Sequence, residues 1–159
     1  MNKRIIMRKK INVLSQEISI IEQNPGASKV LLLIHGNSLH SGFFDPIFKS
    51  SLLNNYRIVA FDLPGHGESG KSDQPEKHYS VLNYIAVLKE LVSVLELKKP
   101  VIYGHSLGGH LAINILPELK NIKGLAFSGT PPLTLPPKLE EAFLPNPDLM
   151  LAFKDKLSL

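Results

Sequence analysis

Cysteine is absent from the 159 residues of this chain. Its absence excludes disulfides, zinc–thiolate sites and a cysteine nucleophile. It also fits a reducing compartment, so we predict a cytoplasmic protein. The sequence has no internal repeat, no apolar run long enough to cross a membrane and no pattern of a secretory signal. We therefore expect no membrane span.

The composition that is present is typical of a globular domain, with 43% hydrophobic and 20% charged residues. The length is enough for one domain with a sizeable apolar core. The formal net charge of +4 owes much to the first ten residues, MNKRIIMRKK. Such a stretch can bind nucleic acid or anionic lipid, but a solvated terminus is the commoner outcome. We assign residues 1–17 to a basic N-terminal arm and expect no nucleic-acid partner.

Strand and helix patterns alternate from about residue 18 onward. Apolar runs indicate strands, the first at a sheet edge and the others buried on both faces, at 18–22, 30–34, 57–61, 101–104 and 124–128. Helices are predicted from an N-cap at Asp45, from an N-cap at Ser80 and directly after Ser106. The alternation predicts an α/β domain over 18–130, with a mostly parallel sheet covered by helices on both faces. Chemistry in such sheets gathers at the carboxyl ends of the strands.

One of these strand ends carries the pattern G-x-S-x-G, in the stretch GHSLG at 104–108. A serine between a strand and a helix can occupy a strained turn that exposes its hydroxyl, and Gly104 and Gly108 remove the side chains that would collide with the turn. The helix that follows directs its amino terminus, including the N–H of Leu107, toward the site where a negative oxygen would develop. We predict Ser106 as a nucleophile.

A second motif, His35-Gly36-Asn37-Ser38, follows the strand at 30–34. A glycine-containing turn there can direct a backbone N–H at the oxygen of a tetrahedral intermediate, opposite the N–H of Leu107. Asn37 is the first choice for this donor and Ser38 the alternative. A plain strand-to-helix turn is the other interpretation of this stretch.

Four stretches, IHGNSLHSGFF, FDLPGHGESG, YGHSLGGHLA and FSGTPP, resemble the successive signatures of the α/β-hydrolase superfamily in their order and approximate spacing. The resemblance covers residues 18–135. It implies a serine hydrolase acting on a small-molecule ester, amide or related acyl bond, with no cofactor or metal. It also implies structural roles in the site motifs for His35, Gly36, Gly104, His105, Gly108 and Gly109.

A second pattern overlaps the stretch FDLPGHGESG: residues 65–72 match the phosphate-binding sequence G-x-x-x-x-G-K-[ST]. A phosphate-binding loop needs a helix that begins at the lysine. The residues after Lys71 and Ser72 have no apolar face, and Pro75 comes too late for such a helix. A nucleotide hydrolase is therefore only a remote alternative.

The base that a serine nucleophile needs is not evident in the sequence. The resemblance implies that an acid and then a histidine follow the serine, but only His110 does so, one turn along the same helix. His105 points to the opposite face, and His35 and His40 lie closer but have no evident acidic partner. The chain therefore resembles only the N-terminal part of an α/β-hydrolase. We expect its α/β-hydrolase fold to be incomplete at the C-terminal side.

Residues 131–159 are interpreted as the start of a cap or lid, or as a proline-rich tail. We predict a serine hydrolase whose acid and histidine are not in this chain. A non-catalytic binding module or a truncated relic is the alternative. The strand at 124–128 is apolar and uncharged. If no further strand pairs with it, it forms an open sheet edge through which we expect the chain to self-associate.

Overall fold

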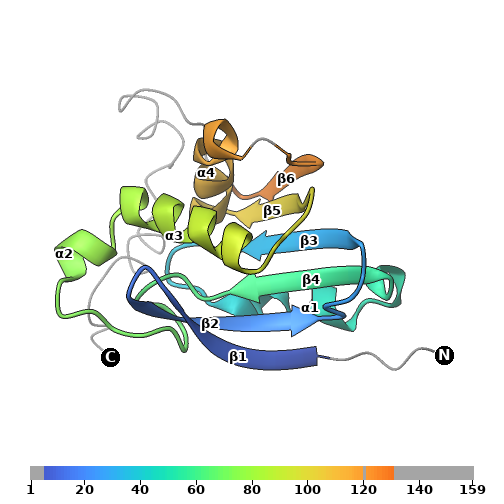
Figure 1. The fold of residues 1–159 in the computed structure, drawn as a ribbon, viewed down its shortest axis with the longest axis horizontal. Coiled ribbons are helices and arrows are strands. Elements are labelled where there is room, and N and C mark those ends of the chain that lie inside the picture. Colours follow the sequence, from blue (N-terminus) through green and yellow to red (C-terminus); the bar gives the residue numbers. More distant parts are fainter. Residues whose placement is uncertain (1–5, 120, 131–159) are drawn as a thin grey trace, which may run out of the picture.

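The computed structural model describes residues 6–119 and 121–130, which contain a six-stranded sheet with helices on both faces (Figure 1). The strands are β1 (Ile6–Val13), β2 (Gln16–Gln23), β3 (Lys29–Ile34), β4 (Tyr56–Phe61), β5 (Val101–His105) and β6 (Gly124–Ser128). Their order across the sheet is β1-β2-β4-β3-β5-β6. The pairs from β4 to β6 are parallel, whereas β2 runs antiparallel to both β1 and β4. The predicted α/β class and mostly parallel sheet are confirmed.

The helical segments are η1 (Ser41–Phe44), α1 (Asp45–Lys49), η2 (Ser51–Leu53), α2 (Pro75–His78), α3 (Val81–Val94), α4 (Leu107–Asn114) and η3 (Leu116–Glu118). Figure 1 shows α3 and α4 on one side of the sheet and α1 on the other. Two apolar clusters fill the space between these layers. Leu88 and Leu91 of α3 belong to the larger cluster, whereas Phe44 and Phe48 pack with Leu33 of β3 in the smaller one.

Helix α3 begins as the sequence predicts. The Ser80 hydroxyl accepts a hydrogen bond from the N–H of Asn83 at 3.2 Å, which satisfies one of the unpaired donors at the helix start. The cap predicted at Asp45 is wrong: the N-cap of α1 is Phe44, and Asp45 lies in the first turn. The reason is that the turn η1 runs directly into α1, so the backbone is already helical before Asp45 is reached.

The N-terminal residues differ most from the sequence-based expectation. Residues 6–13 form strand β1 rather than part of a loose basic arm, and β2 is therefore an interior strand rather than an edge. The antiparallel ladder with β2, which runs from Ile6–Gln23 to Val13–Gln16, holds β1 in the sheet, and charge pairs accompany it. Lys9 of β1 and Arg57 of β4 each lie 2.7 Å from the carboxylate of Glu22, which is almost completely buried. Burial alone would raise the pKa of Glu22, but these two pairs outweigh it and hold the pKa below its ordinary value.

Strand β6 lies at the other side of the sheet and, among the described residues, pairs only with β5. Its Phe127 side chain is exposed. Self-association through this strand stays a prediction. In residues 6–119 and 121–130, no helix is long and apolar enough to cross a membrane. The segment interpreted as the start of a cap or as a tail, 131–159, lies outside the described residues.

Candidate active site

Ser106 lies in a strained turn between β5 and α4. Its backbone angles, φ 50° and ψ −116°, are far from those of a helix or strand, and a residue with a side chain rarely adopts them. The turn is held from both sides: the N–H of Ser106 donates to the carbonyl of Ser128 at 2.9 Å, and the carbonyl of Ser106 accepts from the N–H of Gly109 at 2.9 Å. The strain is therefore maintained by the edge strand β6 together with the first turn of α4.

Close backbone contacts explain the glycines on either side of Ser106. A Cβ atom at Gly104 would collide with the backbone of Gly108, and one at Gly108 would collide with the carbonyl of Ile34 in β3. These contacts bring α4 directly onto the end of the central strand. At Gly109 a Cβ would overlap the side chain of Thr130 rather than backbone.

The loop after β3 lies against the same turn. A Cβ atom at Gly36 would sit 3.0 Å from the Cβ of Ser106, so only glycine allows this approach without displacement. The loop turns at 36–39, where the N–H of Leu39 donates to the carbonyl of Gly36 at 3.3 Å and Ser38 has a positive φ of 60°. Asn37 and Ser38 are exposed on this loop. The structure thus brings the Gly36 loop and the Ser106 turn together at the carboxyl ends of β3 and β5.

His35 does not provide a base for Ser106, because both of its ring nitrogens are occupied. Its Nδ1 donates to the carbonyl of Gly36 at 2.7 Å, and its Nε2 accepts from the N–H of Leu63 at 3.0 Å. The ring is completely buried. Burial lowers the pKa of His35 to about 4, although the bond to Gly36 opposes the shift. A neutral His35 therefore joins the loop after β3 to the loop after β4.

This lowered pKa predicts that acid destabilises the fold. Between pH 6.5 and 4 the unfolded chain binds a proton at His35 that the folded chain excludes, so stability rises with pH across this window. The free energy of unfolding in urea should fall by about 2 kcal/mol between pH 7 and pH 5. In His35→Gln, whose amide can keep one donor and one acceptor, this difference should largely disappear.

His78→Gln is the matched control, because it removes a half-buried histidine of α2. It should keep the pH dependence of the native chain. An unchanged slope in His35→Gln would show that another group causes the acid sensitivity.

His105 and His40 are also held by local partners. The Nδ1 of His105 lies 2.9 Å from the hydroxyl of Ser128, which in turn is 2.6 Å from the hydroxyl of Tyr103. The ring of His105 packs on Phe43 with 4.7 Å between centroids. His40 accepts from the N–H of Gly42 and forms the cap of η1. No hydrogen bond joins any of the six histidine rings to Ser106 within residues 6–119 and 121–130.

Asp62 organises the loops around the site without contacting Ser106. Its carboxylate accepts from the N–H of Ser41 at 2.6 Å and from the N–H of Glu68 at 2.8 Å. Burial would raise the pKa of Asp62, but these N–H donors hold it below its ordinary value. These hydrogen bonds give Asp62 a structural role. Ser128 and Tyr103 were not singled out, because a serine and a tyrosine in a strand carry no recognisable pattern.

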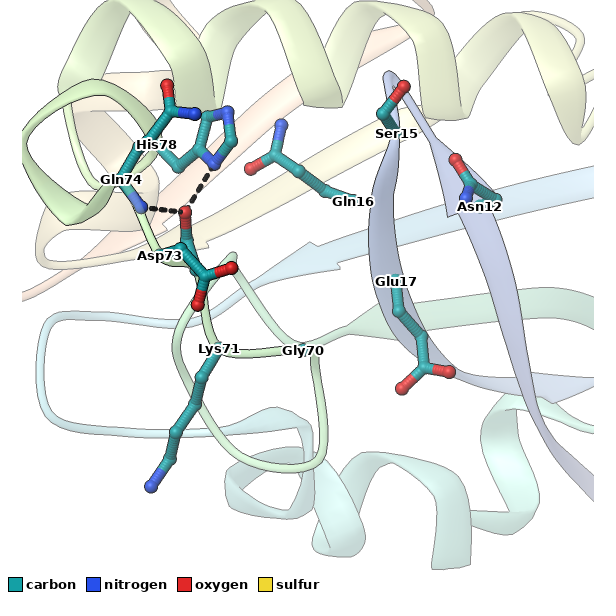
Figure 2. Close-up of a pocket in the computed structure, with 10 residues that line it drawn as sticks. Asn12, Ser15, Gln16, Glu17, Gly70, Lys71, Asp73, Gln74 and His78 are labelled. Carbon is teal, nitrogen blue, oxygen red and sulfur yellow. Dashed lines mark hydrogen bonds between the residues drawn. The ribbon is translucent and has the colours of Figure 1, made fainter.

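A cleft of about 360 Å³ lies to one side, between the β1–β2 turn and residues 70–78, as Figure 2 shows. The Ser72 hydroxyl there lies 2.5 Å from the Nδ1 of His78 and accepts from the N–H of Gln74 at 2.9 Å. Residues 71–74 are not helical, and α2 begins only at Pro75. The helix that a phosphate-binding loop requires at Lys71 is therefore absent. Across the described ranges, no group of three or more histidine, aspartate or glutamate side chains is arranged to hold a metal ion.

Comparison with known proteins gives a consistent result. A family profile described as "alpha/beta hydrolase fold" matches residues 29–157. A serine hydrolase-like protein of Danio rerio is 37% identical over 55% of this chain and 26% of its own length. A pimeloyl-[acyl-carrier protein] methyl ester esterase of Xanthomonas oryzae is 31% identical over 67% of this chain and 39% of its own. This chain thus spans less than half of either relative.

Among solved structures, the N-acyl homoserine lactonase AidH in complex with N-butanoyl homoserine superposes with a TM-score of 0.83. The two sequences are 32% identical, and the match covers 96% of this chain and 55% of the lactonase.

Proposed function

The chain belongs to the alpha/beta hydrolase fold family, and from that premise we propose that it carries the nucleophile and the oxyanion hole of a serine hydrolase. The reaction is acyl transfer from an ester or lactone to water. The observation that carries the proposal is the turn at Ser106, whose positive φ coincides with the close approach of Gly36. A strained serine packed against a glycine loop at the carboxyl edge of a parallel sheet is the arrangement that this chemistry requires.

In the proposed mechanism the Oγ of Ser106 attacks the carbonyl carbon of the substrate. The carbonyl oxygen becomes negatively charged and accepts hydrogen bonds from the N–H of Leu107, at the start of α4, and from the N–H of Asn37, with Ser38 as the alternative donor. The amino terminus of α4 favours that charge. The alcohol then leaves with the proton that the base took from Ser106, and water that gives a proton to the same base releases the acid from the acyl-enzyme.

The proton of Ser106 must pass to a base. His35 is occupied at both nitrogens, and none of the other histidine rings is bonded to Ser106 in the described part of the chain. We therefore propose that the histidine base and its acidic partner are supplied by residues outside this chain. The relatives, of which the chain covers 39% and 55%, are long enough to contain such residues.

The substrate class follows from the relatives and from one exposed ring. The esterase is named for a methyl ester and the lactonase for an N-acyl lactone, and both of these compounds contain an ester carbonyl and an acyl chain. Phe43 is 43% exposed and packs on His105, the residue before Ser106. We propose that this ring forms part of the wall for the acyl chain. The cytoplasmic location expected from the lack of cysteine stays a prediction.

The test is chemical rescue of the missing base. The 159-residue chain alone should react slowly with a fluorophosphonate and with p-nitrophenyl butyrate, because removal of a triad member typically costs about 10⁴-fold or more in rate. After subtraction of the hydrolysis that imidazole causes without protein, added imidazole should raise the rate in the native chain but not in Ser106→Ala. The control is Ser93→Ala, which removes an exposed serine of α3 and should leave the rescue intact.

Two results would contradict the proposal. Rapid stoichiometric labelling without imidazole would mean that a base is already present, and His40→Ala and His110→Ala would then identify it. No labelling at Ser106 even with imidazole would favour the alternative, a non-catalytic relative that keeps the pocket for binding. The absence of a ring bonded to Ser106 is the observation that keeps this alternative open.

A further inference from the structure

A second candidate site lies at the opposite end of the sheet from Ser106. A hollow of about 740 Å³ opens where β3, β4 and β5 begin, and Lys29, Tyr56 and Val101 are the first residues of these strands. Ser106 follows the other end of β5. At about 3.3 Å per residue, the length of a strand separates the two places by roughly 15 Å or more. A ligand in the hollow is therefore not the substrate that Ser106 attacks.

All the charged residues that line the hollow are lysines. Four lysines line it, Lys29, Lys98, Lys99 and Lys123, and all four are exposed, whereas no carboxylate is among its lining residues. The adjoining hollow, which shares Lys98, contains Glu96. It also contains Lys9 and Arg57, both of which are paired with Glu22. An anion in this hollow would therefore meet four lysines and no competing carboxylate among the lining residues.

The backbone holds these lysines in place. Lys99 has a positive φ of 48°, which turns the chain sharply just before the buried Pro100. The carbonyl of Pro100 accepts the N–H of Lys123 at 2.9 Å, so the segments that carry Lys98, Lys99 and Lys123 are joined directly. The ammonium of Lys29 lies 5.6 Å from the centre of the Tyr56 ring. The cluster is therefore built on the fixed ends of strands rather than on a freely moving terminus.

From this arrangement we propose that the hollow binds a small molecule that carries two or more phosphate groups and an aromatic or apolar portion. Lysine ammonium groups bind phosphate oxygens as point charges, and four of them match a polyphosphate better than a single anion. Tyr56 and Val101 provide apolar surface for the rest of the ligand. The concave shape and the volume are those of a small-molecule site rather than of a flat surface for a membrane or a nucleic acid.

The test is calorimetric titration of the full chain with ATP and with inorganic tripolyphosphate, at constant ionic strength. Both should bind with a Kd below about 1 mM, which corresponds to roughly −4 kcal/mol. Sodium sulfate at the same ionic strength should bind much more weakly. The triple variant Lys29→Gln/Lys99→Gln/Lys123→Gln should weaken both interactions at least tenfold.

The control is Lys49→Gln/Lys71→Gln/Lys77→Gln, which loses the same charge from exposed lysines elsewhere, including the one in the loop at 65–72. It should bind within twofold of the native chain, and both variants should keep the native circular dichroism spectrum. Equal loss in the two variants, or loss in the control alone, would overturn the proposal. So would an absence of binding to both phosphates. Binding only to vesicles rich in phosphatidylserine, or only to single-stranded DNA, would also overturn it and assign the lysines to a macromolecular surface.

Discussion

Replacing Gly108 by alanine should lower the melting temperature by roughly 6–12 °C, because it should cost about 3 kcal/mol of stability. The new Cβ would collide with the carbonyl oxygen of Ile34 and lie 2.8 Å from that of His35. Alanine would favour the helix by about 1 kcal/mol over glycine, so the collision must exceed this gain for the prediction to hold. We expect that it does, because the atoms it meets are backbone of the central strand and cannot rotate away.

Gly124→Ala is the matched control for this prediction. Gly124 begins β6, and nothing lies within 4 Å of the position that its Cβ would occupy. The same chemical change should therefore leave the melting temperature within a few degrees of the native value, measured by circular dichroism in the same buffer. A Gly108→Ala protein that melts with the native chain would show that β3 and α4 can separate without cost.

Replacing Asp62 by alanine should cost about 3–5 kcal/mol, because it leaves two backbone N–H groups without their acceptor and empties a buried position. The N–H of Ser41 lies in a buried residue, and its bond to the carboxylate is 2.6 Å long. The loss should loosen η1 and the loop at 62–70 together, since Asp62 is what joins them. Hydrogen exchange should accordingly rise at the N–H of both Ser41 and Glu68.

Asp73→Ala provides the comparison for Asp62→Ala. Asp73 is an exposed carboxylate on the segment that follows the same loop, so its removal should change the unfolding free energy by less than about 0.5 kcal/mol. If Asp62→Ala were equally mild, water would have to replace the carboxylate at both N–H groups. The role assigned to Asp62 would then be wrong.

The interior of the sheet is predictable from the sequence, and its N-terminal side is not. A run such as VLLLI at 30–34 is typical of a strand buried on both faces, and β3 indeed lies between β4 and β5 with most of its residues buried. The stretch at 6–13 gives no such signal, because Arg8, Lys9 and Lys10 resemble a solvated arm. Strand β1 forms by pairing along its whole length with β2, and its basic residues then pair with Glu68, Glu22 and Glu17. Neither the ladder nor these side-chain pairs can be read from residues 6–13 alone.

Parts of the candidate site can be predicted from the sequence, and other parts cannot. The positions of Ser106 and Gly36 follow from short motifs, because steric rules tie a strained turn to particular glycines. The state of His35 could not be read from its motif. It depends on a bond to the N–H of Leu63, which lies on another loop. The hydrogen bonds of Ser128 to His105 and Tyr103 likewise exist only once β5 and β6 have paired.

The strand order also has a consequence for biosynthesis. Strand β3 pairs with β4 and β5, both of which follow it in the sequence, and Leu31 of β3 is opposite Val101 of β5. At roughly 5–20 residues per second, a ribosome needs several seconds to make the residues between them. During that time only the β1–β2 hairpin has its partners close by in the chain. One flank of VLLLI therefore stays without its partner strand on the nascent polypeptide until β5 has been translated.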